Sequence, residues 1–193
     1  MAKPTLLTVE AATALKAVSD DLKAQGYRLK VFDAYRPQRT VNHFVVWAKK
    51  PEDVRMKSYF YRNLDKCVLL PRGYIAEKSG HSRGSTIDLT LFDIATGKEV
   101  DMGATFDWFG KESHPDWCGN PETGEYTAKF PGNTQPTGGK IKEVQFKNRM
   151  ILRKVMIRHG FRPLPEEWWH FTLAKEPIRI LILLIRSSDK PFI

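Results

Sequence analysis

Two short stretches of the sequence carry side chains that can bind a metal ion and catalyse hydrolysis. The stretch 79–88 contains His81 and Asp88, and a second stretch far downstream contains Glu167 and His170. Two imidazoles and one carboxylate make a zinc site with an open position for water, whose pKa the ion lowers to about 7. The fourth group can then act as a base. These residue types predict a metallohydrolase with one zinc ion per chain, bound by His81, Asp88 and His170, with Glu167 as the general base.

The backbone of the first stretch must bring two ligands together. His81 and Asp88 are seven residues apart, so we expect one to lie in a loop and the other in the strand that this loop enters. Gly80 and Gly84 give the loop the conformational freedom to fold both side chains onto one ion.

The second stretch sets a geometric condition. Glu167 lies three residues before His170, and in an ideal strand this odd spacing puts the two side chains on opposite faces. The side chains converge only if the chain turns within residues 167–169, and Pro165 favours a turn nearby. We therefore expect a departure from regular strand geometry there.

An arginine is expected to complete the catalytic set. Arg36 stands in the sequence Asp-Ala-Tyr-Arg-Pro, and we expect it to stabilise the oxyanion of a tetrahedral intermediate, a role worth about 2.7–4 kcal/mol per donor. Each candidate also has a plain structural interpretation: Arg36 can simply pair with Asp33, and Asp88 can be an ordinary carboxylate in a strand. His114 is an alternative metal ligand or a substrate contact. The joint presence of ligands, base and arginine favours the catalytic interpretation.

Hydrophobic periodicity and turn residues predict the elements that must position this set. Apolar residues at helical spacing predict three helices, and β-branched or alternating stretches predict three strands, with polar connections between them. The second helix is expected to bury Phe44 and the third to bury Val144. Because helices and strands do not alternate in βαβ units, we expect an α+β fold. The predicted helices are 9–24, 38–49 and 141–159, the strands 28–33, 85–92 and 168–173, and the irregular connections 51–73 and 110–139.

Length and composition predict a single domain over residues 1–193. A chain of this length with 41% apolar residues can build a core. The formal charge of +9 is spread along the chain without a nucleic-acid-binding motif, so we expect a basic surface and no nucleic-acid partner. The longest apolar run, 180–185, is far shorter than the roughly 20 residues of a membrane span. It is expected to be buried core, with an extra helix or a contact between subunits as the alternatives.

Two cysteines leave the redox state open. Cys67 and Cys118 either form one bridge in an oxidising compartment or remain free thiols. No secretory signal opens the sequence. We expect a cytoplasmic protein, or a periplasmic or secreted one if a signal segment was removed.

Four motifs, in order along the chain, resemble those of the D-alanyl-D-alanine dipeptidases, the VanX-type branch of a zinc D,D-peptidase family. They are Asp-x-Tyr-Arg-Pro, Ser-x-His followed after six residues by Asp, Met-Gly-x-x-Phe-Asp, and Glu-x-Trp-His. They occupy residues 33–37, 79–88, 102–107 and 167–170, and the resemblance runs from about residue 6 to residue 177.

The resemblance implies a fold, a reaction and a set of site residues. The fold would be a central, mostly antiparallel sheet flanked by helices, and the reaction the zinc-dependent hydrolysis of the dipeptide D-Ala-D-Ala, a precursor in peptidoglycan synthesis. Ser79 and Asp107 would hold the substrate, Asp107 through the ammonium group. The roles of the other residues match those above: His81, Asp88 and His170 as zinc ligands, Glu167 as general base and Arg36 as the transition-state donor.

Three departures and two alternative functions accompany the resemblance. Family members carry an upstream segment with a substrate-contacting tyrosine, after which this chain is expected to begin. The loop 117–139 is expected to be longer than usual, and the run 179–186 to differ from the family's tail. A carboxypeptidase or endopeptidase of the same fold would require room for a longer wall peptide. A noncatalytic, zinc-stabilised module that binds the cell wall is the third hypothesis.

Overall fold

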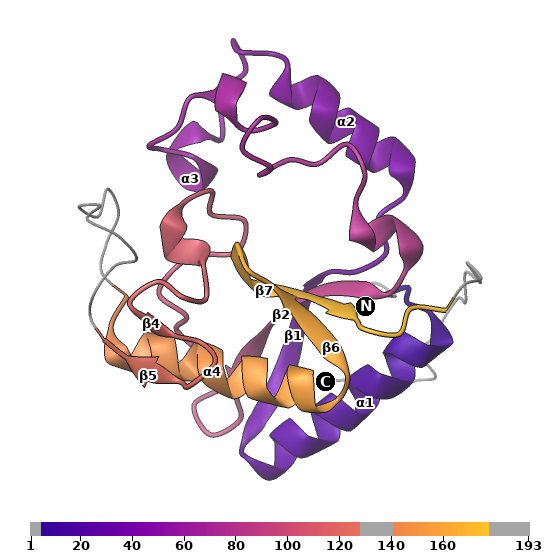
Figure 1. Cartoon of the computed structure of the whole chain (residues 1–193), viewed down its shortest axis with the longest axis vertical. Helices are drawn as coiled ribbons and strands as arrows, with labels where there is room; N and C mark the ends of the chain where they lie inside the picture. The colour runs from indigo at the N-terminus through magenta and orange to yellow at the C-terminus, as the bar shows by residue number, and fades with distance from the viewer. Residues whose placement is uncertain (1–4, 128–140, 178–193) are drawn as a thin grey trace.

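A central antiparallel sheet organises the protein, and its strand order is β1-β2-β7-β6 with the short β3 paired to β2. The computed structural model describes residues 5–127 and 141–177. Figure 1 shows the sheet in the middle of the molecule. The α+β class and the antiparallel sheet that the sequence predicted are confirmed. The strands are β1 (Tyr27–Asp33), β2 (Thr86–Asp93), β3 (Lys98–Glu99), β6 (Phe161–Leu164) and β7 (Glu167–Leu173).

Two long helices lie on one side of this sheet. They are α1 (Val9–Ala24) and α4 (Glu143–Arg158), which contact each other and the strands β1 and β6. The other two, α2 (Gln38–Ala48) and α3 (Lys57–Phe60), lie on the opposite side of the sheet in the view of Figure 1. The helices therefore flank the sheet, and the main core forms between the sheet and the α1–α4 pair.

The predicted helical periodicity matches this core in part. The side chain of Thr8 accepts a hydrogen bond from the amide of Ala11 and caps α1. Val18 and Leu22 of α1 are buried and belong to the main hydrophobic core. Two expectations were wrong, because Phe44 of α2 and Val144 of α4 are exposed by 38% and 58%. Helical spacing fixes which residues share a face, but not how far a neighbouring element covers it.

Strand β6 was not among the predicted strands, because it contains Pro163 and proline disfavours regular strand pairing. A proline cannot donate to a strand ladder, but it is tolerated on an edge strand. The strand order places β6 at the end of the sheet. Its pairing with β7 then makes the two strands a hairpin.

The long connections contain short elements. They are the 3-10 helices η1 (Lys66–Val68), η2 (Gly80–Arg83) and η3 (Lys111–Ser113) and the strand pair β4 (Gly119–Asn120) and β5 (Glu125–Tyr126). Cys67 is exposed and Cys118 is buried, and the two do not form a disulfide with each other. The apolar run 180–185 lies outside the described residues. Within the described ranges, none of the helices combines the length and apolar character that a bilayer crossing requires.

Candidate active site

Three neighbouring strands place polar residues in one row across the sheet. Asp88 of β2 pairs with Asp33 of β1 on one side and with His170 of β7 on the other. Residues directly opposite each other in antiparallel strands project from the same face. The row therefore brings a carboxylate and an imidazole from distant parts of the sequence side by side, with His170 Nδ1 3.0 Å from Asp88 Oδ1.

The helical turn η2 delivers the second imidazole. The hydroxyl of Ser79 accepts a hydrogen bond from the amide of His81 at 3.3 Å and caps this turn. Gly84 ends the turn with a φ of 75°, a conformation that favours glycine. His81 is thereby buried at the end of the row, with Nε2 3.2 Å from Asp88 Oδ2 and 3.4 Å from His170 Nδ1.

A backbone carbonyl determines which nitrogen of His81 is free. Nδ1 of His81 lies 2.7 Å from the carbonyl oxygen of Ala34. Because a carbonyl oxygen can only accept, Nδ1 must carry the proton and Nε2 presents its lone pair to the other two groups. The sequence offered no signal for this contact, since any residue at position 34 has a carbonyl.

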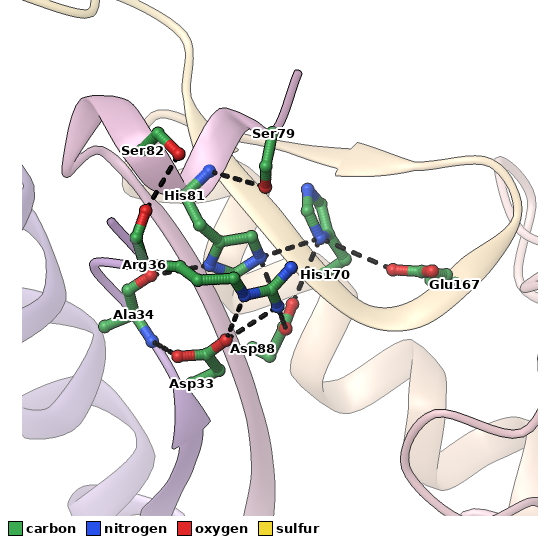
Figure 2. A network of polar contacts seen from close by, with 9 residues as sticks. All are labelled: Asp33, Ala34, Arg36, Ser79, His81, Ser82, Asp88, Glu167 and His170. Carbon is green, nitrogen blue, oxygen red and sulfur yellow. Dashed lines mark hydrogen bonds and ion pairs between the residues drawn. The ribbon is translucent and has the colours of Figure 1, made fainter. Parts of the chain in front are cut away.

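An irregularity in β7 brings Glu167 to the same place. Pro163 of β6 pairs with Phe171, but the next residue, Leu164, pairs with Glu167 rather than His170. Glu167 thus occupies the ladder position that a regular register would give to His170, so it can face the same side. Its Oε2 lies 3.4 Å from His170 Nδ1 (Figure 2). The expected departure from regular strand geometry is present.

The three groups His81, Asp88 and His170 fit a single divalent ion. One ligand atom from each lies within 4.8 Å of the others. In a tetrahedral zinc site with bonds of 2.0–2.1 Å, neighbouring ligand atoms are about 3.3 Å apart. The two imidazole nitrogens are 3.4 Å apart, and each lies near a different oxygen of Asp88, His81 at 3.2 Å from Oδ2 and His170 at 3.0 Å from Oδ1. Asp88 Oδ1 is buried and has no partner of hydrogen-bond geometry, so an unsatisfied oxygen faces the point where an ion would bind.

His114, the alternative ligand, is not part of this cluster. Among the described residues, the only metal-compatible group of three is His81, Asp88 and His170. His114 follows η3, with Nδ1 4.0 Å from Asp116, and burial lowers its pKa. Its carbonyl oxygen accepts a hydrogen bond from Arg149.

Arg36 lies beside the cluster and is held in place. Its Nε and Nη2 donate to Asp33 Oδ2 at 2.8 and 2.6 Å, and Nη2 is 4.0 Å from Asp88 Oδ2. The ring of Phe44 lies 5.2 Å from the guanidinium carbon. The backbone of Arg36 is also tied to η2, because its amide donates to the carbonyl of His81 and its carbonyl accepts from Ser82 Oγ (Figure 2).

The remaining predicted residues, Asp107 and Ser79, differ in their surroundings. Asp107 has a left-handed backbone with a φ of 59°. Burial and then repulsion by Asp88 raise its pKa to about 7. Ser79 is half-buried, and its hydroxyl caps η2. The structure thus brings Asp107 into the electrostatic environment of the cluster, whereas Ser79 shapes the turn that carries His81.

Glu167 and Asp88 have opposite protonation preferences. Burial is the largest cause for both. For Glu167 it prevails and raises the pKa to about 7, with repulsion from Asp88 and Asp107 adding to the effect. For Asp88 the interactions with the imidazoles of His170 and His81 together outweigh burial, and the net shift of the pKa is downward. Asp88 is therefore a carboxylate suited to bind a cation, and Glu167 a carboxyl that exchanges its proton near neutral pH.

A buried His-Asp-His set with a neighbouring glutamate is typical of single-metal hydrolases. The family model described as D-Ala-D-Ala dipeptidase, peptidase family M15, matches residues 1–128 and 131–187. The chain therefore belongs to this family and is a metallopeptidase. The match extends past residue 177, where we expected the resemblance to end, and includes the run 179–186 that was expected to differ.

Curated relatives support the same family. The chain is 39% identical to the D-alanyl-D-alanine dipeptidase of Enterococcus faecalis over 170 residues, which cover 88% of this chain and 74% of that protein. It is 37% identical to the protein of the same name from Streptomyces coelicolor over 152 residues, 79% of this chain and 65% of that protein. It is 30% identical to the one from Escherichia coli over 170 residues, 88% of this chain and 67% of that protein.

Proposed function

We propose that this protein hydrolyses D-Ala-D-Ala to two D-alanines with one zinc ion bound by His81, Asp88 and His170. The observation that supports it most directly is the glutamate beside the ligand set: Glu167 Oε2 is 3.4 Å from His170 Nδ1. A noncatalytic metal site has no need of an unliganded carboxyl in that position. The family membership and the names of the relatives favour the same dipeptide as the substrate.

Zinc, when bound, polarises the scissile carbonyl and makes water a nucleophile at neutral pH. Glu167 takes the proton of the attacking water and passes it to the leaving amine. A general base works best when its pKa lies near the working pH. The raised pKa of Glu167, about 7, meets this requirement.

Arg36 stabilises the negative charge that develops on the carbonyl oxygen. Its guanidinium is oriented by Asp33 and lies next to Asp88. A donor fixed in advance needs no reorganisation as the charge appears, which is why such groups lower barriers effectively. In this role the pairing of Arg36 with Asp33 is part of the catalytic arrangement.

Asp107 binds the ammonium group of the dipeptide, and Ser79 helps to hold the substrate from the start of η2. A buried carboxyl without a fixed cationic partner is costly to ionise. The arrival of an ammonium group supplies the missing charge and favours the carboxylate. The free amine of a dipeptide would thus be recognised, whereas an acylated amine would not.

A direct assay tests the proposal. The protein loaded with zinc is incubated with D-Ala-D-Ala, with L-Ala-L-Ala and with a peptidoglycan stem pentapeptide ending in D-Ala-D-Ala, and released alanine is measured. We expect turnover of the D,D-dipeptide alone, and loss of turnover after chelation with recovery on adding zinc. Preferential cleavage of the pentapeptide would instead indicate a carboxypeptidase or endopeptidase. One zinc per chain with no turnover of any peptide would indicate a noncatalytic wall-binding module.

A further inference from the structure

We propose that Arg149 is a positioning residue for this reaction. From the buried side of α4 it holds two parts of the chain in place relative to each other: the segment 102–114, which carries Asp107, and the irregular part of β7 that carries Glu167, called the bulge below. The inference builds on the proposed function, because it concerns the two carboxyls to which roles in binding and proton transfer are assigned there. It rests on the contacts of a single guanidinium group.

The first set of contacts holds the segment 102–114 at both ends. Arg149 is 1% exposed. Its Nε donates to the carbonyl of Met102 at 2.7 Å, Nη2 to that of Glu112 at 2.7 Å, and Nη1 to that of His114 at 3.1 Å. Asp107 lies between these anchor points. One side chain therefore closes a loop of the chain around the residue assigned to the substrate ammonium group.

The loop needs such an anchor because the backbone at Asp107 is in the left-handed region. A non-glycine residue with a φ of 59° is uncommon, and it persists only where the surroundings hold it in place. Three hydrogen bonds from a buried fork hold the chain on both sides of Asp107.

The second set of contacts reaches the other carboxyl. The guanidinium carbon of Arg149 lies 5.8 Å from the ring centre of Trp168, the residue that follows Glu167. The ring of Trp168 meets that of Trp169 edge to face at 5.3 Å, and Trp169 meets Phe106 in the same way at 5.6 Å. Because Phe106 directly precedes Asp107, these ring contacts connect the bulge back to the segment that Arg149 holds at both ends.

The surroundings of the buried positive charge of Arg149 indicate that the planar shape of its guanidinium group is important. Among the described residues it forms no ion pair with a carboxylate, and its positive charge meets carbonyl oxygens and an aromatic face. Burial accordingly lowers its pKa to about 9. Burying a charge is unfavourable, so a neutral residue at this position would give a more stable core. The planar fork of arginine can reach three carbonyls at once, which the single nitrogen of lysine cannot do.

The hydrogen bonds of Arg149 go to the segment 102–114 and not to His81, Asp88 or His170. The metal ligands lie on η2, β2 and the part of β7 that pairs with β2. A loss of Arg149 should therefore change how the substrate is held and leave the metal stoichiometry unchanged. This separation distinguishes a positioning role from a general contribution to stability.

The test uses Arg149→Lys in the full chain, with Arg153→Lys as the matched control. Arg153 lies one turn further along α4 and pairs with Glu122, outside the segment 102–114. For Arg149→Lys we expect one zinc per chain and a KM for D-Ala-D-Ala raised about tenfold or more, with a smaller change in kcat. The control should leave both constants within about twofold of the unsubstituted protein.

A double substitution shows whether Arg149 acts through Asp107. If it does, Asp107→Asn combined with Arg149→Lys should have the KM of Asp107→Asn alone, because the second change removes support for a group already lost. Multiplicative effects, or a lower melting temperature with unchanged kinetics, would overturn the proposal.

Amide hydrogen exchange in the unsubstituted protein provides an independent test, which requires neither turnover nor a variant that folds. The amide of Phe109, bonded to the carbonyl of Phe60, reports on the loop, and the paired amides of β7 report on the bulge. We expect them to open together, with similar free energies. If the amides of the loop and of the bulge open independently, the positioning role of Arg149 is contradicted, whatever the substrate is. If they open together but the protein does not hydrolyse the dipeptide, only the proposed function is overturned.

Discussion

The two sides of the candidate site shift the pKa values of their carboxyl groups in opposite directions. On the ligand side, His81 and His170 lower the pKa of Asp88 despite its burial. On the other side, burial raises the pKa of Asp107 and Glu167 to about 7. Glu167 and Asp88 both lie within 3.4 Å of the same imidazole nitrogen. Burial alone therefore does not decide the charge of a carboxyl; the number of fixed partners does.

This difference separates the chemistry into two tasks. Under the proposed function, the side with Asp88 would hold a negative charge before any ion binds, as a metal site requires. On the opposite side, Asp107 and Glu167 have pKa values near neutral pH. In the proposed function, one would accept a proton and the other would pair with the ammonium group of the substrate. Each of the predictions below either separates the two sides or shows them to be equivalent.

The largest effect is expected from removing the ligand charge. Asp88→Asn should abolish stoichiometric zinc binding and reduce turnover by on the order of 10⁴-fold, because a catalytic metal contributes several kcal/mol to the transition state. Zinc per chain by elemental analysis and alanine release measure the two effects. Asp93→Asn, at the other end of β2, is the control. Full zinc occupancy in Asp88→Asn would show that Asp88 is not a ligand.

Removing the base should separate turnover from metal binding. Glu167→Gln keeps the size of the side chain but cannot accept the proton, so we expect kcat to fall by about 10²–10⁴-fold. Zinc should remain at one per chain. Glu166→Gln changes the exposed neighbour and should leave both measurements unchanged. Turnover retained in Glu167→Gln would contradict the mechanism.

A smaller loss is expected when the oxyanion donor is removed. Arg36→Met should lower kcat by about 10²–10³-fold, as expected for one fixed donor. The effect on KM should be smaller, because the charge on the oxygen develops only in the transition state. Arg39→Met, at an exposed position at the start of α2, is the matched control. Equal losses in the two variants would assign the effect to surface charge.

The smallest effect concerns the pH dependence of stability in the metal-free protein. The pKa values of Asp107 and Glu167 rise on folding from 3.8 and 4.5 to about 7. Between those values the unfolded chain releases protons that the folded chain keeps, so stability should fall as pH rises from about 4.5 to about 7 and level off above. Each unit of difference corresponds to about 1.4 kcal/mol.

Urea unfolding in the presence of a chelator measures this slope. The double variant Asp107→Asn with Glu167→Gln should flatten it, whereas Glu166→Gln should not. A slope that is the same in all three proteins would show that the two carboxyls titrate normally, and the contrast with Asp88 would then be lost.

Several parts of the fold could be predicted because they depend on local patterns. The helices α1 and α4 follow from apolar spacing, and β2 follows from its β-branched run. Strand β6 could not be predicted, since Pro163 is acceptable only at a sheet edge and edge position is a property of the whole sheet. The exposure of Phe44 and Val144 depends likewise on what neighbouring elements leave uncovered.

The sequence by itself determined which side chains are available: two imidazoles, an aspartate, a glutamate and an arginine in recognisable motifs, together with the family to which they point. Tertiary structure decided how they meet. The register of three strands aligns Asp33, Asp88 and His170, a shift between β6 and β7 turns Glu167 toward them, and the carbonyl of Ala34 selects the free nitrogen of His81. Strand register, backbone acceptors and burial arise from contacts between distant segments, so no local pattern encodes them.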